Sequence, residues 1–128
     1  MDRFADDVST GDSHSDGAGV IDAVGADVDP GRVGSRIWKY GAQSYRPVGT
    51  AAQWKWTCVP LANAVALPDE VGDDIGECLG IPGITGHRAV FGDGPVAGNT
   101  VLVRGVLGSV SSLATQLATW AGATVIAA

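Results

Sequence analysis

The chain has few cysteines, few aromatic residues and no long apolar run. Its two cysteines, Cys58 and Cys78, form no CxxC pair, which favours reduced thiols, packed as small apolar groups, over a disulfide framework or a zinc knuckle. No apolar run approaches the roughly 18 residues that a membrane span needs, and the opening MDRFADD lacks the apolar core of a signal peptide. The sequence therefore predicts a cytosolic protein.

Glycine is the residue type present in excess. The chain holds 19 glycines in 128 residues, about twice the average share. Six prolines and no G-X-Y period exclude collagen. A net charge of −6, from 8 basic and 14 acidic residues, argues against nucleic-acid binding as the main function. The length suits one globular domain with many turns.

Charge is distributed unevenly along the chain. Residues 1–30 hold eight acids and one base, residues 31–66 hold five bases and no acid, and residues 99–128 hold Arg104 alone. The acidic, aperiodic segment 1–18 is expected to be mobile. The bases of the middle segment alternate with apolar residues, which indicates a solvated face of strands. These bases are Arg32, Arg36, Lys39, Arg46 and Lys55.

The first half of the chain has the pattern of short strands divided by glycine turns. Strands are predicted over 19–25, 36–40 and 52–59, with a turn at 29–31 between the first two. In the second strand, Ile37 and Lys39 should face one side and Trp38 and Tyr40 the other. The turn at 67–70 should lead into an acidic helix start over 73–77. This pattern predicts part of a β-barrel or sandwich.

The second half alternates helices and strands. The pattern predicts a helix over 84–91, with Thr85 as a candidate N-cap, and a buried strand over 100–104. Apolar residues at helical spacing then run from Val110 to Ala121, and a second buried strand is predicted over 123–127. This order is a βαβ unit with two parallel strands.

A glycine-rich turn stands between that strand and the long helix. Gly105 and Gly108 match the first positions of a dinucleotide-binding turn, in which backbone N–H groups and a helix N-terminus face a pyrophosphate. Ser111 occupies the third glycine position. A glycine turn of purely structural use fits these residues about equally well.

Taken together, several segments resemble the middle of a medium-chain dehydrogenase/reductase, and most closely the zinc-independent quinone oxidoreductase (zeta-crystallin-like) branch. Their order and spacing agree collectively, which is more specific than any one motif. The segments are 15–21 (SDGAGVI), 34–38 (GSRIW), 49–53 (GTAAQ), 67–69 (LPD), 80–87 (GIPGITGH), 100–105 (TVLVRG) and 116–118 (QLA).

The resemblance implies an α/β plus β fold class, a partial GroES-like β-barrel followed by the first βαβ unit of a Rossmann fold. It places the barrel part in residues 19–68 and the start of the Rossmann domain in residues 69–128. It also implies hydride transfer to a quinone or enone from NADPH, with NADH as the alternative cofactor. Thr85 resembles the threonine beside the nicotinamide, and no side chain need act as a catalytic acid or base. The cofactor-binding residues implied are Thr85, Gly105, Val106, Leu107, Gly108, Ser109 and Val110.

The resemblance also implies that no metal is bound. Ser15 stands where zinc alcohol dehydrogenases have a ligand, and two Cys and two His scattered along the chain cannot supply a zinc site. Relative to the family, the chain matches neither the first part of the barrel nor the Rossmann strands beyond the second. Three interpretations therefore stay open: an oxidoreductase, a non-catalytic remnant or fragment that pairs with another subunit such as a second copy, and a small binding module.

Overall fold

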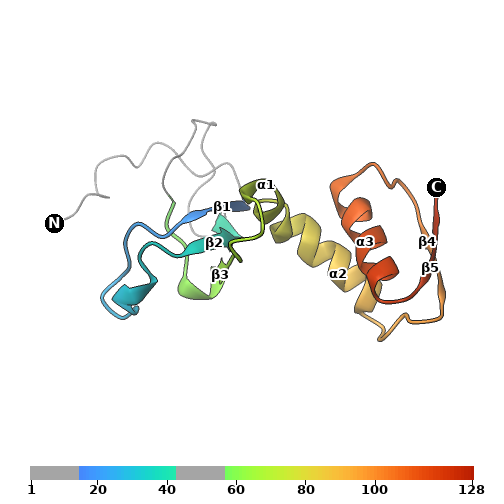
Figure 1. Cartoon of the computed structure of the whole chain (residues 1–128), viewed down its shortest axis with the longest axis horizontal. Helices are drawn as coiled ribbons and strands as arrows, with labels where there is room; N and C mark the ends of the chain where they lie inside the picture. The colour runs from blue at the N-terminus through green and yellow to red at the C-terminus, as the bar shows by residue number, and fades with distance from the viewer. Residues whose placement is uncertain (1–14, 43–56) are drawn as a thin grey trace. The chain divides into compact units, whose positions relative to one another are not determined.

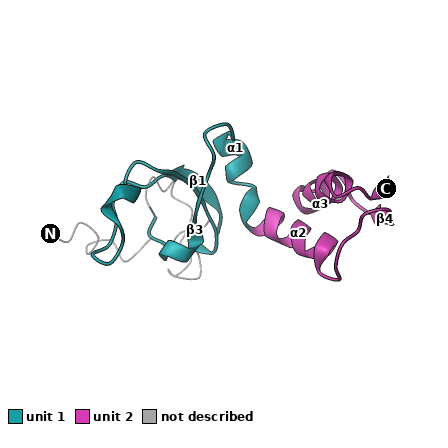
Figure 2. Ribbon diagram, turned by 60° about the horizontal axis from the view of Figure 1, so that its bottom comes forward, with its two compact units in different colours: residues 1–80 teal, residues 81–128 magenta. Residues whose placement is uncertain are grey.

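The computed structural model describes residues 15–42 and 57–128. The chain divides into two compact units, residues 1–80 and residues 81–128 (Figure 2). Each unit has its own sheet, antiparallel in the first and parallel in the second (Figure 1).

The first unit is built on a three-stranded antiparallel sheet in the order β1-β2-β3. The strands are β1 (Gly17–Val20), β2 (Arg36–Lys39) and β3 (Ala64–Ala66), with short 3-10 turns at Pro30–Arg32 and Leu61–Asn63. Trp38 of β2 lies opposite Ala18 of β1 and Val65 of β3. The rings of Trp38 and Tyr40 lie 5.7 Å apart, and Ile37 is buried, so the predicted alternation of faces along β2 is confirmed.

Three predictions for this unit need correction, two on strands and one on the mobile segment 1–18. β1 ends at Val20 instead of continuing to 25, and after it only Ile21 still bonds to the backbone before β2, through Gly34 and Ser35. β1 also begins at Gly17, inside the segment 1–18 that was expected to be mobile. Of the strand predicted over 52–59, residues 57–59 have no regular structure and the remainder lies outside the described residues. The strand that completes the sheet is β3, which the sequence analysis missed.

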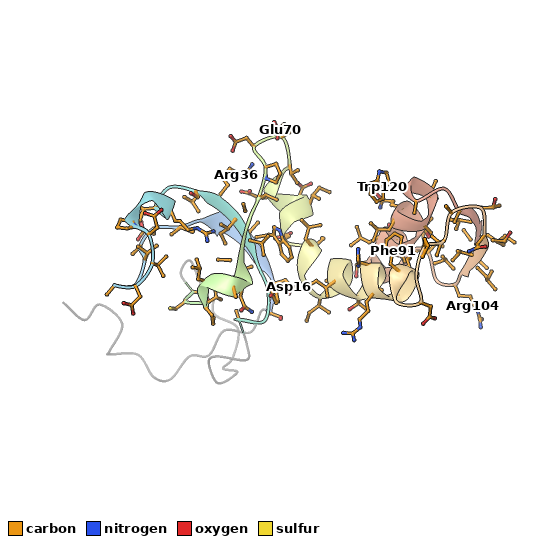
Figure 3. All side chains as sticks on the ribbon, turned by 90° about the horizontal axis from the view of Figure 1, so that it is seen from below. Asp16, Arg36, Glu70, Phe91, Arg104 and Trp120 are labelled. Atoms are coloured by element: carbon orange, nitrogen blue, oxygen red, sulfur yellow. The ribbon has the colours of Figure 1, made fainter. Side chains whose placement is uncertain are left out.

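The basic residues of this unit do more than line a solvated face. Arg36 donates from its guanidinium to the carbonyls of Pro68 at 2.9 Å and Val71 at 2.7 Å, and it pairs with Asp73 at 2.5 Å (Figure 3). Arg32 donates to the carbonyl of Ala64 at 3.1 Å. The expectation of a solvated face is therefore wrong for these two side chains, and Arg46 and Lys55 lie outside the described residues.

A short helix follows the predicted turn at 67–70. Val71 donates to the carbonyl of Pro68 at 3.0 Å in that turn, and α1 spans Asp73–Gly76 with both aspartates in its first turn, as predicted. A Cβ at Gly76 would come within 3.0 Å of Ala18 Cβ and 2.8 Å of Leu67 Cδ2. The absence of a side chain at Gly76 therefore lets α1 pack closely on β1.

The second unit layers two helices on one face of a two-stranded parallel sheet (Figure 1). Its elements are α2 (Ile84–Phe91), β4 (Thr100–Val103), α3 (Ser109–Trp120) and β5 (Thr124–Ala127). α3 lies between α2 and the sheet, and the core between the helices contains Val90, Ala114 and Ala118. The predicted helix over 84–91 is confirmed at both ends, and so are the parallel pair of strands and the helix between them.

The prediction that both parallel strands are buried is wrong on one face. Val103 faces α3 with 8% of its surface exposed, whereas Leu102 is 62% exposed and Ile126 is 53% exposed. Leu102 and Ile126 are register partners on neighbouring strands. A continuous apolar run predicts burial on both faces, but within residues 81–128 the two helices cover only one.

The two cysteines are free thiols, as predicted. Their expected burial is wrong, because Cys58 is exposed and Cys78 is only half-buried.

Candidate functional site

The turn between β4 and α3 is the candidate site. The chain reverses at Gly105, which has a φ of +71°. The amide of Gly105 donates to the carbonyl of Ala128 at 2.6 Å, and the amide of Gly108 donates to the carbonyl of Gly105 at 2.9 Å. The glycine predicted to allow a tight turn therefore adopts the left-handed conformation that favours glycine. The turn is held by backbone hydrogen bonds.

The start of α3 leaves backbone donors available. Gly108 precedes the helix in an extended conformation and supplies no side-chain cap. The first helical hydrogen bond is donated by Ser112 to the carbonyl of Gly108 at 2.8 Å, so the amides of Ser109, Val110 and Ser111 precede the helical ladder. Together with the positive end of the helix dipole, these amides favour an anionic group.

The turn is open to solvent where a ligand would approach. A Cβ at Gly105 would meet no atom within 4 Å, whereas a Cβ at Gly108 would lie 3.3 Å from the carbonyl oxygen of Gly105. Leu107 is fully exposed and Val106 is half-buried. Six of the predicted site residues thus form the turn and the first two residues of α3. They are Gly105, Val106, Leu107, Gly108, Ser109 and Val110.

Close packing behind the turn comes from a glycine that the sequence analysis did not single out. A Cβ at Gly86 of α2 would lie 3.1 Å from the carbonyl oxygen of Val110 and 3.2 Å from the amide of Ala114. The third glycine of a dinucleotide-binding turn serves such packing, but here that position is Ser111. The signals for Gly86 were a glycine inside a predicted helix and its place in the segment 80–87.

Thr85 is exposed in the first turn of α2. It is not the N-cap, since that position belongs to Gly83, and the sequence expectation is wrong on this point. Its neighbour Gly86 faces the backbone of Val110, which connects this part of α2 to the start of α3. The His87 ring lies 4.8 Å from that of Phe91, so it packs along its own helix.

The charge at the turn is carried by Arg104, which directly follows β4 and is exposed. It is the only charged residue of the segment 99–128. A positive side chain beside the helix start adds to the attraction for an anion. Sequence reasoning recorded this charge without assigning it to the site.

In the first unit, Ser15 is the residue that the family resemblance implied at a zinc-ligand position. Its hydroxyl accepts a hydrogen bond from the amide of Gly41 at 3.1 Å, and its carbonyl accepts one from Ala42 at 3.0 Å. Ser15 thus anchors the two residues Gly41 and Ala42 that follow β2. Across residues 15–42 and 57–128, no cluster of three His, Cys, Asp or Glu side chains is arranged to hold a metal.

In the described part of the chain, no helix is long and apolar enough to cross a membrane.

Comparison with known proteins shows what the chain is similar to. No family model matches the chain. A quinone oxidoreductase of Pongo abelii is 34% identical over 107 residues, which are 81% of this chain and 30% of that protein. A solved quinone oxidoreductase of Pseudomonas syringae is 31% identical, with a TM-score of 0.69 over 89% of this chain and 34% of that one.

Two further solved structures have the same fold over most of the chain. A mycobacterial protein in complex with NADPH is 28% identical, with a TM-score of 0.71 over 89% of this chain and 34% of that one. An alcohol dehydrogenase superfamily protein of Novosphingobium aromaticivorans is 30% identical, with a TM-score of 0.73 over 88% of this chain and 34% of that one. The chain spans about a third of the length of these relatives. Over that third, the chain is similar in sequence and fold to quinone oxidoreductases and to an alcohol dehydrogenase superfamily protein.

Proposed function

We propose that the chain acts in an oxidoreductase of the NAD(P)H:quinone reductase type, which transfers a hydride from a nicotinamide cofactor to a quinone or an enone. The observation that carries this proposal is the glycine turn between the parallel strand β4 and α3. A turn of this kind at the carboxyl end of a parallel strand is where dinucleotides bind in this fold. The relatives named quinone oxidoreductase, and the one solved with NADPH, support the same assignment.

The residues of the turn fit the pyrophosphate of such a cofactor. The amides of Ser109, Val110 and Ser111 precede the helical ladder, and the segment 94–128 contains no acidic residue to repel an anion. A side chain on Gly105 would project into the open space in front of the turn. The backbone at this position can therefore approach a ligand closely.

In this proposal the protein binds and orients, and the nicotinamide supplies the hydride when it is bound. Residues 105–110 surround the pyrophosphate, to which the amides at the start of α3 donate, and Thr85 lies beside the nicotinamide. No side chain serves as a catalytic acid or base, and no metal takes part.

A non-catalytic role is the second candidate. The exposed apolar pair Leu102 and Ile126 favours it, because parallel sheets are normally covered on both faces. In that case the chain would bind the cofactor without completing a reaction site, or would pair with another subunit over this face.

The proposal is tested by titrating the chain against NADPH and following the cofactor's fluorescence. We expect saturable binding by the wild-type chain and about tenfold weaker binding by Gly105→Ala. The matched control is Gly98→Ala, because Gly98 has a φ of +76° and a Cβ there also meets no atom within 4 Å. Both variants should lose about 1 kcal/mol of stability, but only Gly105→Ala should lose affinity. No saturable binding at millimolar protein would contradict the proposal.

The two candidate functions are separated by turnover. Oxidation of NADPH by the chain in the presence of a quinone supports the oxidoreductase. Saturable binding without any quinone-dependent oxidation supports the non-catalytic role instead.

A further inference from the structure

Gly86 brings the backbones of α2 and α3 close together. A Cβ on Gly86 would lie 3.1 Å from the carbonyl oxygen of Val110 and 3.2 Å from the amide nitrogen of Ala114. Both atoms belong to the backbone of α3, so no change of side-chain rotamer could make room for an added methyl group. Such a group must instead displace one helix from the other by a few tenths of an ångström.

The two helices run side by side in the same direction. Gly86, in the first turn of α2, lies against Val110 in the first turn of α3. Val90, one turn further along α2, shares a buried cluster with Ala114 and Ala118, which lie further along α3. The starts of both helices are therefore at the same end of the pair.

Both helix starts carry residues of the candidate site. Thr85 directly precedes Gly86 in the first turn of α2. α3 begins directly after the turn at 105–108, and the amides of residues 109–111 precede its helical ladder. The packing of the helices at Gly86 therefore sets the separation between Thr85 and these amides.

We propose that Gly86 is a positioning residue, which holds Thr85 and the start of α3 at the separation that one nicotinamide dinucleotide spans. This inference rests on the proposed function, because that function assigns Thr85 to the nicotinamide and the start of α3 to the pyrophosphate. A helix that is displaced as a rigid body carries its own amides with it. A ligand that contacts only the start of α3 then keeps its contacts, whereas a ligand that reaches both helices loses some of them.

The test compares two ligands by calorimetric titration of the full chain. ADP-ribose 2′-phosphate is NADPH without the nicotinamide ring, so it keeps the pyrophosphate but lacks the group beside Thr85. We expect the wild-type chain to bind NADPH more tightly than this fragment. Gly86→Ala should weaken NADPH binding about three- to tenfold, because a misplacement of about 1 Å can cost about a hundredfold. The same variant should change the binding of ADP-ribose 2′-phosphate by less than about twofold.

Ala89→Gly is the matched control, at an exposed position of the same helix. It lowers the helix propensity of α2 by removing a methyl group and should leave both dissociation constants unchanged. Gly86→Ala should change the thermal unfolding midpoint little, because its gain in helix propensity opposes the cost of overpacking. A loss of affinity in this variant would therefore not arise from unfolding.

The outcomes separate this inference from the proposed function. An equal loss for both ligands in Gly86→Ala overturns the inference and assigns Gly86 to the support of the pyrophosphate turn alone. Unchanged binding of both ligands also overturns it, because the helix pair then adjusts without moving the site. Equal binding of the two ligands by the wild-type chain overturns the role of α2 and leaves cofactor binding at the turn standing. A wild-type chain that binds neither ligand contradicts the proposed function itself, and with it the role of Gly86.

Discussion

The segments that connect helices and strands are held by different kinds of hydrogen bond in the two units. In the first unit, side chains reach across the sequence to backbone carbonyls: Arg32 to Ala64, Arg36 to Pro68 and Val71, and Asn63 to Tyr40 at 2.9 Å. In the second unit, the hydroxyls of Thr115 and Thr119 bond to carbonyls four residues earlier in α3. Its turn at 104–108 is closed by backbone hydrogen bonds.

This difference predicts which kinds of substitution each unit tolerates. A segment held by a charged side chain is weakened when that side chain is removed, because the carbonyls it bonds to lose a donor. A segment held by backbone contacts and glycines is weakened when a side chain is added. The candidate site belongs to the second kind, so its binding surface depends more on positions without a Cβ than on particular side chains.

The largest effect should come from adding a side chain between α2 and α3. Gly86→Val places methyl groups where a Cβ alone would lie 3.1 Å from a backbone oxygen of α3, so the helices must separate. We expect a loss of about 3 kcal/mol in the free energy of unfolding, at the upper end for overpacking. Urea unfolding followed by circular dichroism measures this loss.

The matched control for this variant is Ala89→Val, at an exposed position of the same helix. It adds a similar side chain and should cost only a few tenths of a kcal/mol, from helix propensity. Hydrogen exchange should show faster exchange in α2 and α3 of Gly86→Val, with β1 and β2 unchanged. Equal stability of the two valine variants would show that the helix pair relaxes without cost.

A smaller effect should come from removing a side chain in the first unit. Arg36→Met deletes the donor to two carbonyls and a carboxylate and should cost about 2 kcal/mol. Asp73→Asn removes only the ion pair, whose carboxylate is 64% exposed, and should cost no more than about 1 kcal/mol. Thermal unfolding of both variants, at low and high salt, measures the difference.

If Asp73→Asn proves as costly as Arg36→Met, the ion pair and not the carbonyl bonds would hold the turn at 67–70. The same conclusion would follow if the two variants lost the same stability at high salt, since salt screens exposed ion pairs.

The sequence predicted the second unit better than the first, because its signals are local. The turn residues from Gly92 to Pro95 mark the end of the helix predicted over 84–91, and α2 has the predicted bounds. The turn residues 105–110 are contiguous in the chain, so the pattern that predicted a turn there also located the candidate site. Gly86 was missed because its importance depends on a contact with Val110, which lies in another helix.

The first unit was harder to predict because its determinants are distant in sequence. β3 contains three residues, too few for a recognisable alternation of apolar and polar positions. Arg36 carries its charge in an alternating pattern typical of a solvated strand, yet its acceptors lie 32 to 37 residues further along the chain. Composition and spacing record that a charge is present but contain no information on such partners.

The smallest effect should come from the uncovered face of the parallel sheet. Leu102→Thr and Ile126→Thr replace side chains that are 62% and 53% exposed, so each should change the free energy of unfolding by no more than about 0.5 kcal/mol. Val103→Thr, one residue along β4 and 8% exposed, is the matched control and should cost about 1 to 3 kcal/mol, because it buries a hydroxyl. If the two exposed positions prove as sensitive as Val103, this face is covered in solution. Sedimentation velocity would then distinguish a second copy, which the threonine variants should dissociate, from another part of the same chain, which would leave a monomer throughout.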